Sequence, residues 1–176
     1  MNTPSANPSV WTLGLMCHAK SDWADENLTD HDRPLNARGR RDAPAMARWL
    51  AAQRFLPEVI LASTATRVRQ TVEGLLSVWT HEPLVLFSQS LYLPHPQTIT
   101  TQVYCEALAA DGQRPRAALV VAHNPAMEQL VSQLAGAVTR MPTAAVALFE
   151  CEGLDGGAGQ RLQARRCIAL GRPKEI

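Results

Sequence analysis

The sequence predicts an α/β protein, specifically a three-layer α/β/α sandwich with a mostly parallel central sheet. Short apolar runs of strand length alternate with segments in which apolar residues recur every three or four positions, as on one face of a helix. Two late apolar runs follow each other with no helix between them, so at least one antiparallel strand is expected. Strands that alternate with helices imply a sheet covered on both faces.

The first half of the chain predicts three strands and two helices. The strands are Val10–Met16, Val59–Leu61 and Leu84–Phe87, each an apolar run. A polar, proline-punctuated segment precedes the first helix, which ends before Pro57. The apolar face of that helix comprises Ala43, Met46, Ala47 and Leu50. The stripe of the second helix comprises Val68, Val72, Leu75, Leu76 and Trp79.

The second half predicts two further helices and three further strands. Ala117–Ala122 is the clearest strand of the chain, and Ala145–Cys151 and Leu162–Leu170 flank a glycine-rich turn at Gly153–Gly159. The helix before Ala117 carries a stripe of Ile99, Val103, Ala107 and Leu108. The helix after Ala122 carries Met127, Leu130, Val131 and Leu134.

Length and composition bound the class of protein. We expect a disordered lead-in at residues 1–9 and one domain at residues 10–176, long enough to bury an ordinary core. A formal net charge of +1 gives no reason to expect nucleic acid or a membrane as partner. No apolar run reaches the roughly 20 residues of a membrane-spanning helix, and the first residues do not form a signal peptide. Four cysteines without a CxxC pair indicate neither a zinc ribbon nor a disulfide framework, so we expect a cytoplasmic protein.

Three functional side chains follow predicted strand ends. They are His18, Arg67 and His123, and the carboxyl ends of strands are where open α/β sheets bind ligands. An arginine in the first turn of a helix is poorly placed for the helix dipole, unless it faces an anion. His123 lies just before a predicted helix N-terminus, which itself favours anions. We expect Ser63 or Thr64 to cap the helix of Arg67, and Asn124, with Pro125 at the first helical position, to cap the helix after His123.

Two histidines, an arginine and free amides on one rim favour a phosphoryl group. Neutral His18 would attack phosphorus and form a phosphohistidine, while Arg67 and His123 hold the equatorial oxygens and water then releases phosphate. This chemistry requires no metal. Any one of these residues alone is more often structural, as a strand-end hydrogen bonder or a solvated helix residue. We interpret His31 as a loop hydrogen bonder, and His81 and His95 as surface residues.

A set of short motifs runs in order along nearly the whole chain. They are Cys17-His18-Ala19 with its continuation Lys20-Ser21-Asp22-Trp23, Asp32–Asn36 with Arg38-Gly39, the spaced residues Ser63, Arg67 and Thr71, Leu91-Tyr92-Leu93, Val121–Pro125, and Arg172-Pro173-Lys174. Together they resemble the histidine phosphatase superfamily, specifically its SixA-type phosphohistidine phosphatase branch. That branch carries Arg-His-Gly/Ala after its first strand, a Ser-x-x-x-Arg-x-x-x-Thr pattern and a second histidine motif.

The resemblance implies a phosphatase without cofactor, in which His18 is the nucleophile and Arg67 and His123 belong to the phosphate pocket. We expect Asn124, Lys20 and the degenerate position Cys17 at the same pocket. The expected partners are a phosphohistidine-containing protein and inorganic phosphate, and the chain is expected to be a monomer or a weak dimer. Larger relatives protonate the leaving oxygen with an acid, but the segment Ser90–Thr98 contains none. A phosphohistidine, whose leaving group is nitrogen, depends less on such an acid.

Cys17 departs from the pattern, which has arginine there. Losing one preorganised donor to the phosphoryl group typically slows turnover by about 10²–10³-fold. A cysteine phosphatase would need an arginine six positions on, where this chain has Trp23, and a zinc site of Cys17, His18 and His123 conflicts with neighbouring side chains pointing apart. Two alternatives remain: an inactive module that binds phosphate or a phosphoprotein, and a small-molecule phosphatase.

Overall fold

The computed structural model describes residues 10–107, 115–152 and 162–176. Its centre is a six-stranded sheet in the order β3-β2-β4-β1-β5-β6. The strands are β1 (Val10–Cys17), β2 (Val59–Ser63), β3 (Leu84–Ser88), β4 (Ala117–Ala122), β5 (Val146–Glu152) and β6 (Ala164–Gly171). β1 pairs with β4 in parallel, as β2 does with β3 and β4, whereas β5 runs antiparallel to both β1 and β6. The predicted mostly parallel sheet with an antiparallel strand is therefore confirmed.

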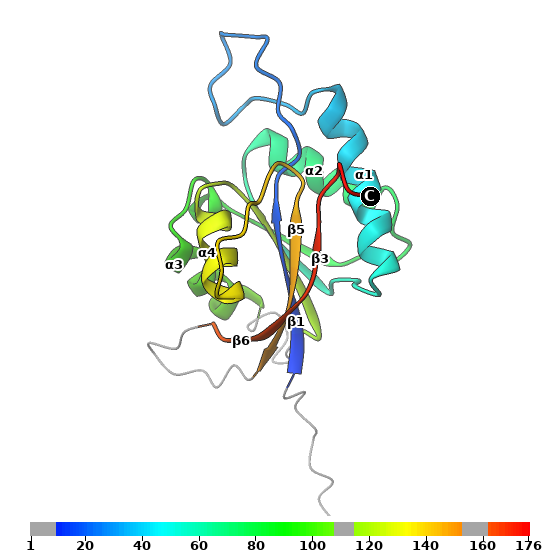
Figure 1. The fold of residues 1–176 in the computed structure, drawn as a ribbon. Coiled ribbons are helices and arrows are strands. Elements are labelled where there is room, and N and C mark those ends of the chain that lie inside the picture. Colours follow the sequence, from blue (N-terminus) through cyan, green and yellow to red (C-terminus); the bar gives the residue numbers. More distant parts are fainter. Residues whose placement is uncertain (1–9, 108–114, 153–161) are drawn as a thin grey trace, which may run out of the picture.

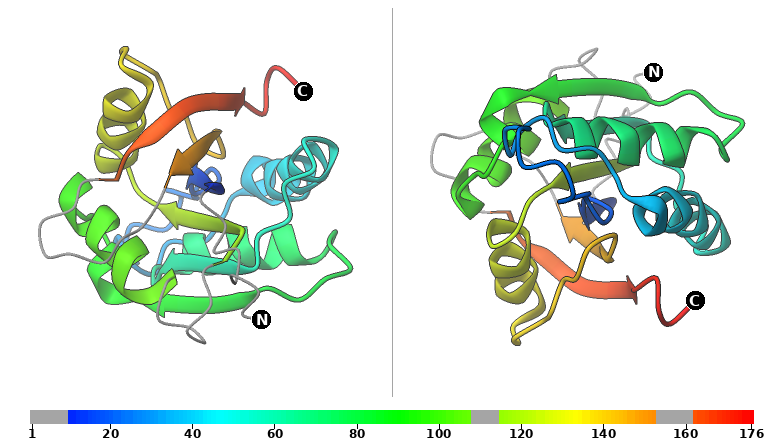
Figure 2. Two further views of the ribbon diagram at one scale, coloured as in Figure 1. Left: turned by 90° about the horizontal axis from the view of Figure 1, so that it is seen from below. Right: turned by 90° about the horizontal axis from the view of Figure 1, so that it is seen from above.

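Helices cover both faces of the sheet. α1 (Ala37–Ala52) and α2 (Thr66–Leu76) lie on one side, and α3 (Pro96–Gln102) and α4 (Ala126–Ala135) lie on the other (Figures 1 and 2). β4 contributes side chains to the cores on both faces of the sheet, because successive side chains of a strand point to opposite faces. Val120 packs in the core beneath α3 and α4, whereas Leu119 and Val121 pack beneath α1 and α2. This confirms the three-layer α/β/α sandwich.

Several predicted elements differ from the structure in their extent. α2 ends at Leu76, so Trp79 is buried in the turn beyond the helix instead of lying on its stripe, and its indole donates to the carbonyl oxygen of Ala47. A short 3₁₀ turn, η1 (Gln89–Leu91), precedes α3. The predicted helix before β4 begins as α3 and continues as a π-helical segment, η2 (Val103–Ala107). Leu108, the turn at 153–159 and the expected lead-in at 1–9 lie outside the described residues.

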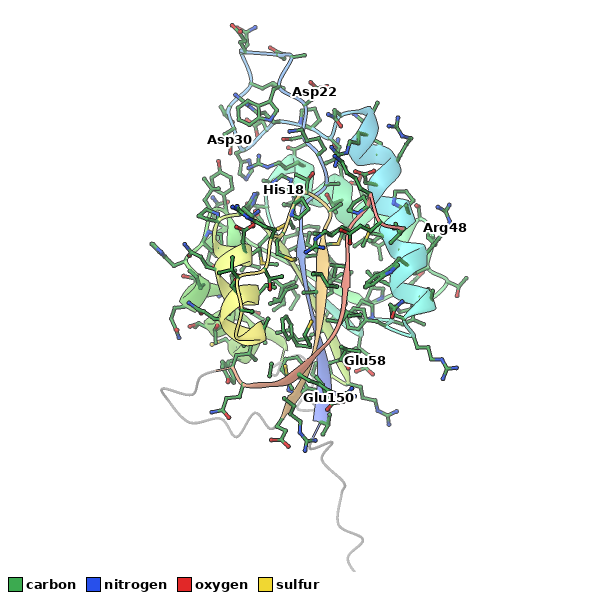
Figure 3. The ribbon with its side chains drawn as sticks, in the orientation of Figure 1. His18, Asp22, Asp30, Arg48, Glu58 and Glu150 are labelled. Carbon is green, nitrogen blue, oxygen red and sulfur yellow. The ribbon has the colours of Figure 1, made fainter. Side chains whose placement is uncertain are left out.

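The topology brings the ends of β1, β2 and β4 to one rim. In the register of the sheet Cys17 pairs with Ala122, and Ala62 pairs with Val121, so the residues that follow these strands emerge together. His18 lies at this rim, while Glu58 and Glu150 mark the opposite end of the sheet (Figure 3). The segment from His18 to Asn36 projects beyond the rim before α1 begins (Figure 1). In the described parts of the chain, the helices are too short or too polar to span a bilayer.

Candidate active site

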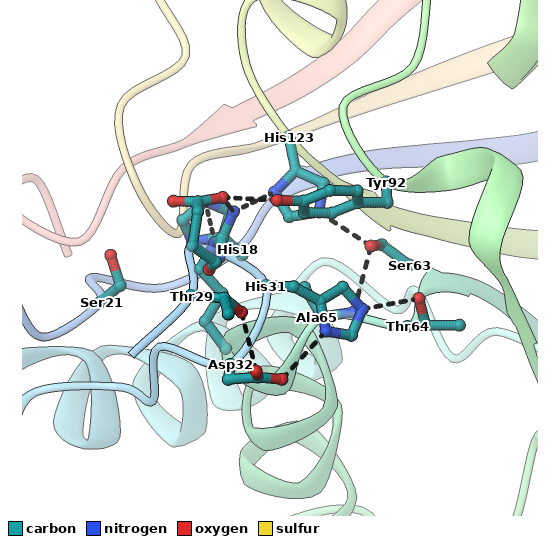
Figure 4. A network of polar contacts seen from close by, with 12 residues as sticks. His18, Ser21, Thr29, His31, Asp32, Ser63, Thr64, Ala65, Tyr92 and His123 are labelled. Atoms are coloured by element: carbon teal, nitrogen blue, oxygen red, sulfur yellow. Dashed lines mark hydrogen bonds and ion pairs between the residues drawn. The ribbon is translucent and has the colours of Figure 1, made fainter. Parts of the chain in front are cut away.

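The three side chains predicted to share a site are in contact. Nε of Arg67 donates to Nε2 of His18 at 3.3 Å, and Nη2 of the same guanidinium lies 3.3 Å from Nδ1 of His123. The two imidazole rings are 5.1 Å apart between centroids. Figure 4 shows His18 and His123 lying together beside Tyr92. The structure therefore brings these three side chains together at the rim formed by the ends of β1, β2 and β4.

His18 is held by backbone bonds on both sides. Its N–H donates to the carbonyl oxygen of Ala122 at 3.1 Å, and its carbonyl oxygen accepts from the amide of Ala144 at 3.0 Å. Its Nδ1 lies 2.7 Å from the carbonyl oxygen of Ala19. A carbonyl only accepts, so Nδ1 carries the proton and Nε2 keeps a free electron pair. That electron pair faces Arg67.

Arg67, the second residue of α2, is only 4% exposed. Its carbonyl oxygen accepts from the hydroxyl of Thr71 at 2.7 Å, and the same hydroxyl accepts from the amide of Ala19 at 3.0 Å. Thr71 therefore ties the helix of Arg67 to the residue that follows His18. This connection gives a physical role to the threonine of the Ser63, Arg67, Thr71 pattern.

His123 is 1% exposed and is fixed by Ser63. Its Nε2 lies 2.8 Å from Oγ of Ser63. Because the guanidinium of Arg67 only donates, Nδ1 of His123 is an acceptor and Nε2 carries the proton that goes to Ser63. The predicted capping role of Ser63 or Thr64 is wrong: α2 has Ala65 at its N-cap position and no side-chain cap. Ser63 is used to position His123 instead.

Both histidines are neutral at ordinary pH. Burial lowers the pKa of His18 to about 4, and the positive charge of Arg67 adds to the effect, although the bond to Ala19 opposes it. Burial also lowers the pKa of His123 to about 3, with further contributions from His18 and Arg67. An uncharged imidazole is the form in which histidine acts as a nucleophile.

Asp30 and Tyr92 complete the network, and sequence reasoning did not identify either as a site residue. Oδ2 of Asp30 accepts from Nη2 of Arg67 at 2.9 Å and from the hydroxyl of Tyr92 at 2.8 Å, and Nη1 of Arg67 donates to the backbone oxygen of Asp30. Burial disfavours the Asp30 carboxylate, but the bonds from Tyr92 and Arg67 outweigh it and lower the pKa of Asp30. The ring of Tyr92 also packs edge-on against His123.

Cys17 faces away from this network. Its side chain is 2% exposed, and its Sγ donates to Oδ1 of Asn124 at 3.2 Å and to the carbonyl oxygen of Met141 at 3.4 Å. Burial, reinforced by the negative charge of Glu128, raises the pKa of Cys17 to about 12. The thiol is therefore neutral, and it supplies no charge at the position where the family pattern has arginine.

Asn124 also differs from the prediction. α4 begins at Ala126 with Pro125 at its N-cap position, so Asn124 lies one residue earlier than expected. Its Oδ1 accepts from the amide of Glu128 at 3.2 Å, and its Nδ2 donates to the carbonyl oxygen of Met141 at 2.7 Å. The amide side chain is thus engaged with the loop before β5, away from the two imidazoles. The structure places it beside Cys17, whose Sγ donates to its Oδ1.

Lys20 and His31 lie outside the contacts among His18, Arg67 and His123. Lys20 is partly buried, lines a neighbouring cavity, and its charge contributes to the lowered pKa of His18. His31 bonds to Oγ1 of Thr64 at 3.0 Å through its Nε2 and packs against Tyr92, as expected of a loop hydrogen bonder. His81, in contrast to its predicted surface role, bonds to the carbonyl oxygen of Pro57 at 3.0 Å and packs on Trp79.

Comparison with known proteins identifies the family of the chain. The family model of the histidine phosphatase superfamily (branch 1) matches residues 13–86. An uncharacterized chloroplastic protein of Arabidopsis thaliana is 31% identical over 168 residues, covering 86% of this chain and 75% of that protein. An uncharacterized protein of Mycobacterium tuberculosis is 36% identical over 120 residues, covering 68% of this chain and 70% of that protein.

Solved structures show the same fold. A protein of Agrobacterium tumefaciens assigned as the phosphohistidine phosphatase SixA superposes with a TM-score of 0.72 at 25% identity, covering 93% of this chain and 98% of that one. A SixA protein histidine phosphatase in complex with tungstate superposes with a TM-score of 0.71 at 22% identity, with the same coverage. These relatives agree with the ordered motifs of the sequence. The chain therefore belongs to the histidine phosphatase superfamily, and its fold is that of the SixA-type phosphatases.

Proposed function

We propose that this protein is a phosphohistidine phosphatase that works through a phosphohistidine on its own His18. One observation carries the proposal: Nε2 of His18 is unprotonated, because Nδ1 carries the proton and donates it to the carbonyl oxygen of Ala19. This unprotonated Nε2 lies 3.3 Å from Nε of Arg67. A neutral, oriented nucleophile beside a permanent cation is what attack on a phosphoryl group requires.

In the first step, Nε2 of His18 attacks phosphorus and the P–N bond of the substrate breaks. The electron pair of that bond returns to the substrate imidazole, which takes up a proton from solvent. Arg67 donates to the equatorial oxygens, for which the phosphoryl group must displace the carboxylate of Asp30 from Nη2. His123 acts through Arg67: its Nδ1 accepts from Nη2 of the guanidinium, while its only N–H is bonded to Ser63.

In the second step, water attacks the phosphorus of the enzyme phosphohistidine. The bond between phosphorus and Nε2 of His18 breaks, inorganic phosphate leaves, and the imidazole regains its electron pair. No step is routed through a metal ion. The bond between Nδ1 and Ala19 persists through both steps and keeps the same nitrogen available for the next turnover.

The need of the leaving group for a proton separates the possible substrate classes. Asp30, the carboxylate bonded to Arg67, has a lowered pKa and therefore carries no proton to give at neutral pH. The segment Ser90–Thr98, where larger relatives often carry their acid, contains none. An alkoxide leaving from a phosphate ester needs a proton donor, whereas an imidazole leaves more easily without one. This favours a phosphohistidine, carried by a protein, over a small phosphate ester.

The buried thiol of Cys17 supports one rival, a module that binds a phosphorylated partner without turning it over. The position of a phosphate-binding arginine is filled by a neutral group that faces Asn124 and Met141. Removing one preorganised donor slows such reactions by about 10²–10³-fold and leaves the remaining donors in place. We therefore expect slow turnover and retained phosphate binding.

The test is phosphate release from a histidine-phosphorylated protein by the wild type and by His18→Gln. Gln keeps a polar side chain of similar reach and cannot form the phosphoramidate. Turnover by the wild type that His18→Gln lacks supports the proposal. Equal release by both proteins excludes His18 as the nucleophile, and binding without any release establishes the rival. A panel of phosphate esters, assayed in parallel, identifies a small-molecule phosphatase if an ester is hydrolysed faster.

A further inference from the structure

A cavity of about 350 Å³ opens where segments distant in sequence meet, with Lys20, two residues after His18, in its lining. Its walls come from the loop after β1, the start of α1, the loop before β5 and the C-terminal segment after β6. The lining residues that matter here are Lys20, Arg38, Arg172, Lys174, Glu175 and the pair Pro142-Thr143.

The cavity is built from the same backbone that holds the nucleophile. Lys20 follows His18 by two residues, and its carbonyl oxygen accepts from the amide of Asn36 at 3.0 Å. The Pro142-Thr143 wall runs directly into Ala144, whose amide donates to the carbonyl oxygen of His18 at 3.0 Å. A substrate whose phosphoryl group lies on His18 therefore has its neighbouring residues within reach of this cavity.

The walls carry a surplus of positive charge. Four basic residues and one acidic residue line the cavity, a net formal charge of +3 in a chain whose total is +1. Arg38 pairs with Asp42 at 3.1 Å, and Arg172 pairs with Glu175 at 3.0 Å. Within residues 10–107, 115–152 and 162–176, neither Lys20 nor Lys174 has an ion-pair partner. These two ammonium groups are left to attract an anion that does not belong to the described chain.

We propose that this cavity binds acidic side chains of the substrate protein, next to its phosphohistidine. The proposal rests on the proposed function and names the surface by which the substrate is selected. The cations come from three separate elements, and their long side chains can each meet a separate carboxylate. A volume of about 350 Å³ is of the size that holds several side-chain groups, whereas a single phosphate needs convergent donors such as those around Arg67. Pro142 and Pro173 add apolar walls for the stems of these side chains.

The charges of Arg38 and Lys174, which lie on elements apart from the nucleophile's loop, are expected to act on association and leave the chemical step unchanged. Charged groups at the rim of an interface chiefly alter the rate of encounter and its dependence on salt. The predicted signature is a change in KM at constant kcat, which disappears at high ionic strength because salt screens exposed charges.

The experiment uses two phosphohistidine peptides, one with glutamates and one with glutamines flanking the phosphorylated residue. The variant is Arg38→Glu combined with Lys174→Glu, which reverses two charges of the cavity and spares Lys20. Arg48→Glu is the matched control, because Arg48 is an exposed residue of the same helix, ten positions and about 15 Å beyond Arg38 (Figure 3). Near-ultraviolet circular dichroism verifies that the variants keep the fold.

The wild type and Arg48→Glu are expected to show a KM roughly tenfold lower for the glutamate peptide, a preference that the double variant loses at unchanged kcat. About 0.5 M salt is expected to abolish the preference. An equal KM for both peptides in the wild type overturns the proposal. So does a double variant that keeps the preference as Arg48→Glu does.

A second readout separates this proposal from the proposed function. If the wild type turns over neither peptide, the proposed function fails, and the cavity is tested by fluorescence anisotropy with a labelled, unphosphorylated glutamate peptide. Binding that Arg48→Glu retains and the double variant loses supports the cavity as an acidic docking site. Equal binding of the glutamate and glutamine peptides, or no binding of either, overturns the proposal. Displacement of the glutamate peptide by low concentrations of inorganic phosphate assigns the cavity to a small anion and also overturns it.

Discussion

The carboxylate of Asp30 lies 2.9 Å from Nη2 of Arg67, so the guanidinium that contacts both histidines is already paired with an acid. The hydroxyl of Tyr92 holds the same carboxylate oxygen at 2.8 Å. A phosphoryl group that approaches His18 must therefore compete with Asp30 for Arg67. Under the proposed function, this competition weakens the binding of phosphate to Arg67.

Asp30→Asn is expected to strengthen inhibition by inorganic phosphate by roughly three- to tenfold. The amide oxygen still accepts a hydrogen bond, but the negative charge that opposes phosphate is gone. The measurement is the inhibition constant of phosphate, or its affinity by calorimetry. Asp32→Asn is the control, because Asp32 is an exposed carboxylate two residues on that bonds to Thr29 and His31 and does not contact Arg67. Unchanged or weaker phosphate binding in Asp30→Asn would contradict the competition.

Cys17→Arg is expected to raise kcat by on the order of 10²-fold. The substitution restores a charged, fork-shaped donor to the residue before His18, where the family pattern has one, and the longer side chain must leave the Asn124 and Met141 contacts of the thiol to reach the phosphoryl group. The negative charge of Glu128, which contributes to the high pKa of the thiol, is expected to stabilise the positive charge of the new guanidinium.

The controls for this variant are Cys17→Lys and Cys17→Ala, assayed for kcat together with thermal unfolding. Lysine adds charge without the bidentate geometry and should give a smaller gain, and alanine should give none. An arginine variant that keeps its fold and gains nothing would show that the family arginine is not what limits turnover here.

The free energy of unfolding should fall as the pH is lowered from about 6.5 towards 4. His18 and His123 have pKa values of about 4 and 3 in the folded protein, below the ordinary value of 6.5, so in this range only the unfolded chain takes up their protons. Proton uptake then favours unfolding by roughly 1.4 kcal/mol per pH unit for each histidine. The lowered pKa of Asp30 acts separately, at still lower pH.

Urea unfolding between pH 7.5 and 4.5 measures this slope. The variants His18→Gln and His123→Gln should each remove about half of it, because each deletes one of the two buried groups. His95→Gln, at the N-cap position of α3, is the control and should leave the slope unchanged. A wild-type protein whose stability is flat over this range would show that the histidines are not held neutral by burial.

Thr71→Val should destabilise the protein by about 1–3 kcal/mol and reduce kcat. The side chain is fully buried, and its hydroxyl bridges the amide of Ala19 and the carbonyl oxygen of Arg67. Valine fills the same space but leaves the Ala19 amide buried without a partner. Thr71→Ser restores the hydroxyl and should recover kcat, with a loss of about 1 kcal/mol for the missing methyl group. Equal kcat in the two variants would remove Thr71 from the positioning of His18.

Periodicity alone placed the layers of the fold, because each buried strand is a continuous apolar run and each helix has one apolar face. β4 and α4 are the clearest cases, and their predicted positions are confirmed within a few residues. Helix starts were harder to place. Ser63 is a good capping residue by type, but its hydroxyl bonds to His123 instead. Asn124 lies one residue before the N-cap position of α4, and its side chain bridges the Glu128 amide and the carbonyl oxygen of Met141.

The residues of the site that follow strand ends were predictable, and the others were not. His18, Arg67 and His123 emerge from adjacent strands, so topology alone brings them together. Asp30 sits in a polar loop with three other aspartates within ten residues, and nothing local distinguishes it. Its contact with Arg67 depends on how the loop folds back over the rim, which no short-range pattern records. Tyr92 belongs to the motif Leu91-Tyr92-Leu93, but its bond to Asp30 depends on the same folding back of the Asp30 loop.

The proposed mechanism requires that a phosphoryl group be transferred to Nε2 of His18. Rapid quenching under alkaline conditions after mixing with a phosphohistidine protein, followed by ³¹P NMR and peptide mapping, tests it most directly. We predict a phosphoramidate on Nε2 of His18 that forms faster than phosphate is released and is absent in His18→Gln. A phosphoryl group on any other residue, or phosphate release with no phosphoenzyme during a single turnover, would contradict it.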